Sequence, residues 1–306
     1  LYTDSGIIPI REVNSSRIIG EPVDVDFKLA TPEGFCKCSK FIYNGIKQTL
    51  KFNMNNGDTL EVTPDHLIRS NNKWVYAKDL NEKDYIDFES IETFNNNYQN
   101  INLTYITNAA LKFTKELAYY FGAILGDGNI SNKNVYFTSE DYELIQYMSG
   151  ITKMYNLGLA HENVQKYTKT SNKPFIRLNC GAKKARDLCK DVTLIDESGH
   201  KQFKVPDIVF KSPNDVKFAF IQGLFDTDGT ISNYEGHKHN FCLEFCTKSK
   251  QLAIGCAHLL KSLGVSCRIC DSYNKVYDRT YYKLKIRATS ARQFKNLGGF
   301  RCIHKQ

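Results

Sequence analysis

The sequence predicts an α+β protein in which an all-β module, residues 1–105, precedes a duplicated unit of helices and strands. Two observations predict this division. Short alternating runs cut by Gly, Asn and Pro fill the first hundred residues, without a helical period. In the remaining residues, an apolar helical stretch that ends in Asp-Gly occurs twice, at residues 120–128 and 220–229.

The all-β module is predicted from four runs of strand character. Residues 34–42 and 49–54 alternate between polar and apolar side chains, and a turn sequence containing Asn-Gly follows each of them. Two further short runs follow at residues 59–62 and 74–80. Residues 90–110 are rich in Asn and weakly patterned, and we interpret them as a linker.

The second helical stretch has recognisable start and stop signals. Ser212 is the expected N-cap, Pro213 takes the first helical position, and the carboxylate of Asp215 follows three residues after the cap. The helix is expected to run apolar to Phe225, with Gly229 as a left-handed C-cap.

Each helix carries a glycine in its middle, Gly122 or Gly223, and ends at an aspartate, Asp127 or Asp228. A mid-helix glycine costs about 1 kcal/mol relative to alanine, and close packing of two helix backbones would explain that cost. Helices paired in this way bring the two carboxylates together, where they repel unless they share a cation. The alternative is that Asp-Gly marks a turn, but a repeated ten-residue pattern makes this less favourable.

Matching strands and helices follow each motif, so we expect repeats of the form α-β-β-α-β over residues 106–210 and 211–306. Charge is divided unevenly between the module and the repeats. Residues 1–110 hold 11 Lys/Arg and 15 Asp/Glu, a net charge of −4, whereas residues 111–306 hold 30 and 18, a net charge of +12. A basic excess beside paired carboxylates favours a nucleic acid partner, although surplus charge also serves solubility.

One strand of each repeat has a basic or polar face suited to a DNA groove. Period two places one set of side chains opposite an apolar set in residues 281–287, and the same holds for residues 175–180. Such a sheet packs on helices with one face and presents the other to bases and phosphates. A solvated outer face is the alternative. The candidate DNA-binding residues are Arg177, Asn179, Tyr281, Lys283, Lys285 and Arg287.

The paired motifs resemble those of LAGLIDADG homing endonucleases. The resemblance implies a monomer that binds a long double-stranded DNA site, cuts both strands across the minor groove and leaves short 3′ overhangs. It implies that Asp127 and Asp228, with the preceding Gly126 and Thr227, hold Mg²⁺ (Mn²⁺ is a substitute), which activates water and stabilises the leaving oxygen.

A basic residue late in each repeat lies near the metal site in that family. Lys204 and Lys305 each follow the aspartate of their repeat by 77 residues. The resemblance therefore implies that these two lysines polarise water or stabilise the pentavalent phosphorane.

The module resembles the N-terminal half of an intein splicing (Hint) domain. The matching residues are Asn44-Gly45, Gly57, the run Thr63-Pro64-Asp65-His66, and Trp74 leading to Lys78-Asp79-Leu80. By resemblance, Thr63 and His66 polarise the scissile peptide bond; the alternative is a turn with an exposed imidazole.

The chain opens on Leu1 and has no closing His-Asn before a nucleophile, so we expect it not to splice itself. On this view the ends are absent or the module is a remnant, and host protein flanks a true intein.

Composition bears on the cellular location of the protein and on the state of its cysteines. No apolar run reaches membrane-spanning length, and the ten cysteines without a leader predict free thiols in an intracellular protein, nuclear in a eukaryote and otherwise cytoplasmic. Cys267 and Cys270 have no second pair at zinc spacing. Two other functions stay open: a splicing protein with a passenger endonuclease, and a non-cleaving binder such as an RNA-splicing maturase or a regulator.

Overall fold

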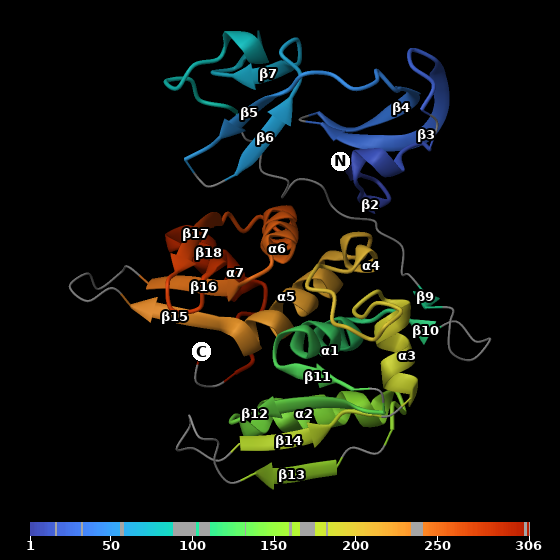
Figure 1. The fold of residues 1–306 in the computed structure, drawn as a ribbon, viewed down its shortest axis with the longest axis vertical. Coiled ribbons are helices and arrows are strands. Elements are labelled where there is room, and N and C mark those ends of the chain that lie inside the picture. Colours follow the sequence, from blue (N-terminus) through green and yellow to red (C-terminus); the bar gives the residue numbers. More distant parts are fainter. Residues whose placement is uncertain are drawn as a thin grey trace. The chain divides into compact units, whose positions relative to one another are not determined.

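The chain divides into two compact units, Leu1–Asn95 and Asn96–Gln306 (Figure 1). The predicted linker at residues 90–110 lies outside the described residues, apart from the short strand β9 at Asn102–Leu103. This computed structural model describes residues 1–15, 17–31, 33–55, 58–87, 102–103, 111–131, 133–158, 161–165, 175–181, 183–233, 241–302 and 305.

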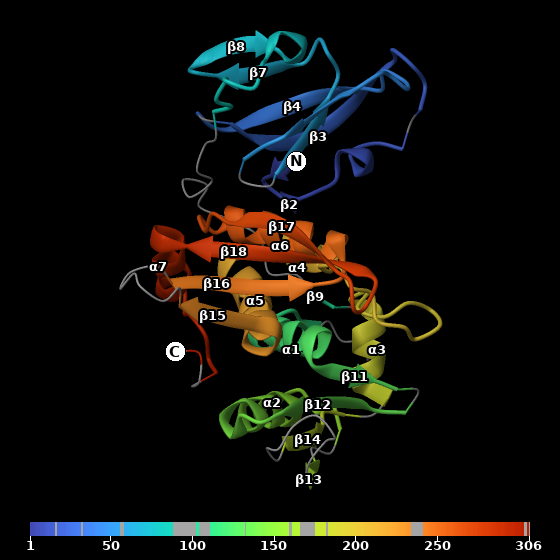
Figure 2. The same ribbon diagram turned by 60° about the vertical axis from the view of Figure 1, so that its left-hand side comes forward.

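The first unit is β-structure, as predicted, with two 3-10 turns among its described residues. One sheet has the strand order β2-β1-β3-β4, and two hairpins, β5-β6 and β7-β8, follow it along the chain (Figure 2). The elements are β1 (Tyr2–Thr3), β2 (Gly6–Ile7), η1 (Ile10–Glu12), β3 (Pro22–Thr31), β4 (Gly34–Ile42), β5 (Leu50–Asn53), β6 (Thr59–Val62), β7 (Leu67–Ser70), β8 (Lys73–Tyr76) and η2 (Ala77–Asp79).

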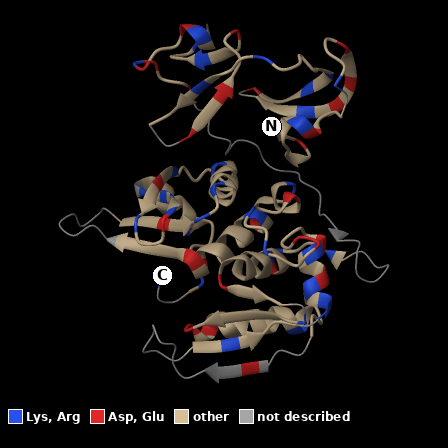
Figure 3. Cartoon of the chain, in the orientation of Figure 1, with Lys and Arg blue, Asp and Glu red and all other residues tan. Residues whose placement is uncertain are grey.

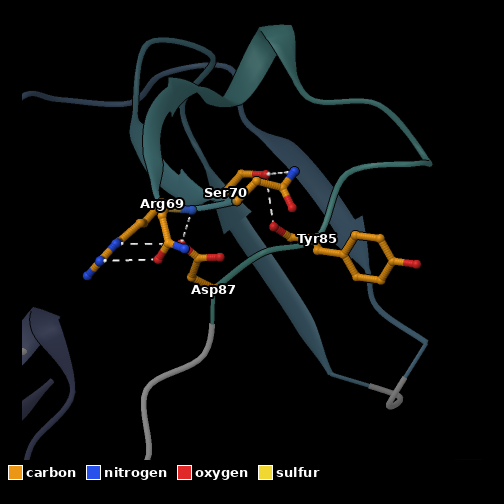
Figure 4. A network of polar contacts seen from close by, with 6 residues as sticks. Arg69, Ser70, Tyr85 and Asp87 are labelled. Carbon is orange, nitrogen blue, oxygen red and sulfur yellow. Dashed lines mark hydrogen bonds and ion pairs between the residues drawn. The ribbon is translucent and has the colours of Figure 1, made fainter.

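A polar network fastens the end of the first unit to its last hairpin (Figure 4). The Ser70 hydroxyl donates to the carbonyl of Tyr85 at 2.8 Å, and the Asp87 amide donates to the carbonyl of Arg69 at 2.9 Å. The Arg69 guanidinium also lies 3.5 Å from the Asp87 carboxylate. These bonds hold residues 85–87 beside β7 before the chain leaves the unit.

The second unit contains two sets of elements in the same order. After the β9-β10 hairpin, where β10 is Leu111–Lys112, each set runs α-β-β-α-β-β-α. The predicted α-β-β-α-β outline was therefore short by one strand and one helix. The first set is α1 (Lys115–Gly126), β11 (Gly128–Ile130), β12 (Val135–Ser139), α2 (Tyr142–Met154), β13 (His161–Gln165), β14 (Phe175–Asn179) and α3 (Lys183–Asp191).

The short helix α4 (Asp207–Phe210) joins this set to the second. The second set is α5 (Asn214–Asp228), β15 (Gly229–Asn233), β16 (Phe241–Thr247), α6 (Lys250–Ser262), β17 (Arg268–Asn274), β18 (Arg279–Arg287) and α7 (Ala288–Asn296). The two sheets have equivalent strand orders, β11-β12-β14-β13 and β15-β16-β18-β17.

The core of the second unit is built around α1 and α5, which pack side by side (Figures 1 and 2). Nearly every side chain from Leu117 to Leu125 and from Val216 to Phe225 is buried, which explains why these two stretches are largely apolar. None of the described helices is long and apolar enough to cross a membrane.

The ends of α5 differ from the prediction. Ser212 does not cap the helix, since its hydroxyl donates to the carbonyl of Ile208 and the N-cap position falls on Pro213. Gly229 is extended, with φ of −81°, and begins β15 at once. A Cβ on Gly229 would lie 2.4 Å from the carbonyl oxygen of Phe225, so close approach of the chain, rather than a left-handed turn, requires glycine there.

Candidate functional site

The two mid-helix glycines lie at the contact between α1 and α5. A Cβ on Gly122 would lie 2.1 Å from the carbonyl oxygen of Phe220, and a Cβ on Gly223 would lie 2.2 Å from that of Tyr119. No side chain larger than hydrogen fits at either position without moving a helix. The glycines therefore permit the backbone contact that aligns the carboxyl ends of the two helices.

Asp127 and Asp228 meet at those aligned ends. Asp127 is the C-cap of α1 and Asp228 is the last residue of α5. A Cβ on Gly126 would lie 3.4 Å from Oδ2 of Asp228, which places that carboxyl against the end of the opposite helix. Figure 3 colours Asp and Glu red and Lys and Arg blue along the whole chain.

Both aspartates are exposed, so solvent and ions reach the side chains, yet dense surroundings weaken hydration of the carboxyls. Desolvation, followed by repulsion from Asp127, raises the pKa of Asp228 to about 6. Desolvation also raises the pKa of Asp127, while Lys305 and Lys201 oppose the rise. Asp127 is therefore close enough to raise the pKa of Asp228.

Two lysines, Lys201 and Lys305, donate to carbonyls at the helix ends that carry the acids. Nζ of Lys201 donates to the carbonyl oxygens of Leu125, Gly126 and Gly128 at 2.9, 3.1 and 2.6 Å. Nζ of Lys305 donates to those of Phe225, Asp226 and Thr227 at 3.2, 2.7 and 2.9 Å. Each ammonium has three donors and directs all of them at backbone carbonyls where a helix ends, and the acceptors of Lys201 include Gly128, the first residue of β11.

The lysine that corresponds to Lys305 is thus Lys201, not the predicted Lys204. Lys201 follows Asp127 by 74 residues, so an equal spacing of 77 pairs the wrong lysine with the first helix. Burial lowers the pKa of Lys201 to about 8, and the charges of Asp228 and Asp127 oppose that shift. The two lysines place positive charge where two carboxylates repel each other.

The donor set at the helix ends fits a divalent cation of the hard type. Asp127 and Asp228 offer carboxylate oxygens, which Mg²⁺ prefers, and desolvation, joined at Asp228 by repulsion from Asp127, raises the pKa of both carboxyls. The backbone oxygens of Gly126 and Thr227 already accept from the lysines, although each retains a second lone pair. No group of three or more His, Cys, Asp or Glu side chains gathers as a metal cluster within the described part of the chain.

The sheet of the first repeat presents Arg177 and Asn179 on the face opposite the buried Leu178. The Arg177 guanidinium lies over the ring of Tyr136, 5.8 Å from its centroid. The Asn179 side-chain oxygen accepts from the amide of Gly181 at 3.1 Å, so part of this side chain is used in the turn.

The sheet of the second repeat carries more charge. Tyr281, Lys283, Lys285 and Arg287 alternate with Tyr282, Leu284 and Ile286, and the last two of these are fully buried. Lys285 is paired with Glu244 of β16 at 3.2 Å, and the neighbouring strand β17 adds Arg268 directly opposite Lys285. Both sheets therefore have the apolar inner face and polar outer face that alternation predicts.

In the first unit, Thr63 and His66 border a hollow of about 600 Å³. The amide of His66 donates to the carbonyl of Thr63 at 3.0 Å, closing a turn, and the imidazole is exposed. A hydrogen bond from Thr63 lowers the pKa of Asp65. The remaining residues around the hollow are Asn44, Gly45, Ile46, Lys47, Thr49 and Leu67.

All ten cysteines are free, in agreement with the expectation of thiols. Cys267 is buried directly before β17, and Cys270 is partly buried within that strand.

Sequence patterns did not single out Lys201, Gln222 or Asp226 as functional residues. Asp226 is 3% exposed and Gln222 is 9% exposed, and both are polar residues among buried α5 residues that, apart from Lys217, are otherwise apolar. That contrast was visible in the sequence, because Phe121 and Leu125 stand at the equivalent positions of the first motif. Nothing in the sequence distinguishes Lys201 from Lys204, since both are basic and only three residues apart.

Comparison with known protein families agrees with the duplication. Residues 215–299 match the LAGLIDADG-like domain, and residues 116–175 match the WhiA LAGLIDADG-like domain. The matched ranges begin within the first turn of α5 and of α1. The chain therefore carries two LAGLIDADG-like domains.

Several curated proteins are similar to this chain. The replication factor C small subunit of Methanocaldococcus jannaschii is 25% identical over 296 residues, which are 94% of this chain and 14% of that protein. A probable translation initiation factor IF-2 of the same organism is 26% identical over 191 residues, 60% of this chain and 15% of that protein. The DNA polymerase of Thermococcus hydrothermalis is 36% identical over 93 residues, 30% of this chain and 5% of the polymerase. The chain thus spans a small part of each relative.

Solved structures that the chain is similar to include mesophilic variants of the homing endonuclease I-DmoI, at 19% identity over 60% of this chain and 95% of that chain, with a TM-score of 0.42. The homing endonuclease I-WcaI bound to its DNA recognition sequence is 19% identical, and the match covers 60% of this chain and 81% of that chain, with a TM-score of 0.46. The N-terminal LAGLIDADG domain of DUF199/WhiA is 15% identical, covers 66% and 91%, and has a TM-score of 0.40.

Proposed function

We propose that this protein is a site-specific endonuclease that hydrolyses both strands of a long double-stranded DNA with the help of a divalent metal ion. The observation that supports this most strongly is the convergence of Asp127 and Asp228 at the ends of α1 and α5, each backed by a lysine. One acid and one lysine come from each repeat, which matches a substrate with two strands.

In this proposal, the aspartates bind the metal ion and the lysines provide positive charge near the scissile phosphate. Asp127 and Asp228 would hold Mg²⁺, or Mn²⁺ in its place, and the bound ion supplies charge neutralisation at the phosphate and a more acidic water. Lys201, whose pKa is about 8, is mostly charged at neutral pH. Because its three donors are occupied by carbonyls, we assign it an electrostatic role at the phosphate rather than the role of a base.

The outer faces of the two sheets are proposed as the DNA-binding surface. Arg177 in the first repeat, and Tyr281, Lys283 and Arg287 in the second, occupy the outer faces of the two sheets whose first strands, β11 and β15, begin directly after the acids. The net charge of +12 over residues 111–306 provides sequence-independent attraction to phosphates. We further propose that one chain suffices, because it contains both repeats.

An origin as an inserted, intein-type segment is supported by the relatives. A replication factor subunit, an initiation factor and a DNA polymerase have unrelated functions, yet each matches this chain over only 5–15% of its own length. A mobile segment carried by different hosts produces this pattern.

Selection of cleaved sites from a random double-stranded DNA library tests the proposal. We expect the protein to linearise a defined family of sequences with Mg²⁺ and to bind without cutting when Ca²⁺ replaces it. A protein that binds DNA but leaves every library member intact with Mg²⁺ or Mn²⁺ is instead a regulator or a maturase-like binder.

Peptide-bond chemistry in the first unit is a second candidate. Its support is the hollow that contains Thr63, Asp65 and His66, a hydroxyl, a carboxylate and an imidazole at one place. In the parent protein with its flanking segments, His66→Ala should slow splicing and leave DNA cleavage unchanged. Normal splicing of that variant would remove this role.

A further inference from the structure

The C-terminal part of the second repeat is attached to α5 by two side chains that have no polar equivalent in the first repeat. Gln222 and Asp226 are four residues apart and therefore lie on one face of α5. The equivalent residues of α1, 101 positions earlier, are Phe121 and Leu125, which are fully buried in the apolar core. We name Gln222 and Asp226 the α5 anchor.

Asp226 forms three hydrogen bonds in a buried place. Oδ1 accepts from the amides of Arg301 and Cys302 at 2.9 and 3.1 Å, and Oδ2 accepts from the hydroxyl of Tyr119 at 2.7 Å. A carboxylate only 3% exposed is costly unless such partners satisfy it. Because Tyr119 belongs to α1, the anchor also links the two repeats.

Gln222 holds the chain slightly earlier. Its amide nitrogen donates to the carbonyl oxygens of Gly299 and Gly298 at 2.9 and 3.4 Å. Both glycines have positive φ, +58° and +138°, and a Cβ on Gly298 would lie 2.9 Å from Cε1 of Phe218. The double glycine therefore lets the chain turn back onto α5 after α7, within reach of the anchor.

Lys305 comes three residues after the anchored Cys302. Three residues span at most about 11 Å, so fixing the backbone at Cys302 confines Lys305 to the end of α5. The amide of Lys305 also donates to the carbonyl of Cys302 at 3.0 Å. The ammonium then reaches the last carbonyls of α5, beside Asp228.

Resting on the nuclease function proposed above, we propose that Gln222 and Asp226 are positioning residues. They hold the segment 298–302 so that Lys305 places its charge at the second helix end, and they thereby set the cleavage rate of the one strand that Lys305 serves. Lys201 is independent of the anchor, because its own turn holds it: Oδ1 of Asp196 accepts from the amide of His200 at 2.9 Å, and Ile195 pairs with Lys201.

Strand-resolved cleavage by the full chain tests the assignment, with a different label on each DNA strand. Asp226→Leu copies the first repeat, and Gln222→Met is a milder companion in case the first variant folds poorly. We expect both to slow one strand, Asp226→Leu by roughly 10- to 100-fold, and the same strand should be slowed by Lys305→Met. The matched control Asp196→Ala should slow the opposite strand.

Hydrogen exchange provides a readout that does not depend on cleavage. In the wild type the amides of residues 298–302 should be protected, and in Asp226→Leu they should exchange faster while those of Gln202 and Phe203 do not change. Equal slowing of both strands, or unchanged exchange in both anchor variants, would overturn the proposal. If exchange is faster in Asp226→Leu but the wild type cuts no DNA, the result would support the anchor and reject the nuclease function.

Discussion

Lys201 and Lys305 reach matching places by different routes, and the contrast between the two repeats is instructive. Lys201 sits in a turn closed by its own neighbours, residues 195–202. Lys305 depends on side chains about 80 residues earlier in the sequence, Gln222 and Asp226. The two repeats share a positive charge at the C-terminal end of a helix, because a cation there interacts favourably with the helix carbonyls and the nearby carboxylates. The chain segment that supplies the charge differs between the repeats.

The largest expected effect comes from the acids. Asp127→Asn and Asp228→Asn should each lower cleavage by at least about 10³-fold, since each removes a charge that holds the divalent ion, while DNA affinity changes little. Single-turnover cleavage together with a gel-shift titration measures the two effects separately. Full activity of either variant would show that the repeats do not share one site.

Cleavage rates of lysine variants should distinguish Lys201 from Lys204. Lys201→Met and Lys305→Met should each slow one strand by roughly 10- to 100-fold, so nicked DNA accumulates, because a charge near the scissile phosphate is lost. Lys204→Met is the control and should cut at nearly the wild-type rate. A larger effect of Lys204→Met than of Lys201→Met would show that Lys204, and not Lys201, acts on the scissile phosphate in the first repeat.

The helix contact should be equally sensitive from both sides. Gly122→Ala and Gly223→Ala each push a methyl group to within 2.2 Å of a facing carbonyl oxygen, so each should lower the free energy of unfolding by about 2–3 kcal/mol. Gly150→Ala in α2 meets nothing within 4 Å and should raise it by up to about 1 kcal/mol. Urea unfolding measures all three, and a harmless Gly122→Ala would exclude the tight contact.

The acid pair should also appear in the pH dependence of stability. Asp228 has a folded pKa of about 6 against an ordinary 3.8, so the folded state binds the proton more tightly than the unfolded state. Its contribution is therefore complete below pH 3.8 and lost as the pH rises through about 6. Without metal, the wild type should lose stability relative to Asp228→Asn as the pH rises through this window, and the apparent Mg²⁺ affinity should weaken as the pH falls through about 6. Because solvent reaches the carboxyl, the change in stability is small.

The smallest expected effect is a change in DNA affinity at the outer face of the second sheet. Glu244 neutralises Lys285 on the outer face of the second sheet. Glu244→Gln should therefore raise DNA affinity a few-fold and steepen the salt dependence by about one counterion. Asp271→Asn removes the same charge from β17 at a position opposite Tyr282, on the other face, and serves as the control. An equal gain in both variants would show that net charge, not the outer face, governs binding.

Local patterns predicted most of the elements but not their ends. Alternation identified the outer faces of β14 and β18, because a strand side chain can point only to one side or the other. The N-cap of α5 fell one residue after Ser212, and Gly229 began a strand, because packing against neighbouring chain decided where the helix stopped. The extra strand and helix of each repeat lacked a repeated signal as strong as the helical motif.

For the candidate site, the sequence by itself determined the two glycines, the two acids and their equal place in a duplicated motif. These depend on short-range spacing along a helix, which is the same in any fold that contains it. Only the tertiary structure decided which lysine meets each helix end and which buried polar residues hold it there. Lys201, Gln222 and Asp226 act on groups about 75 residues away, and contact over such a separation depends on how the chain folds back.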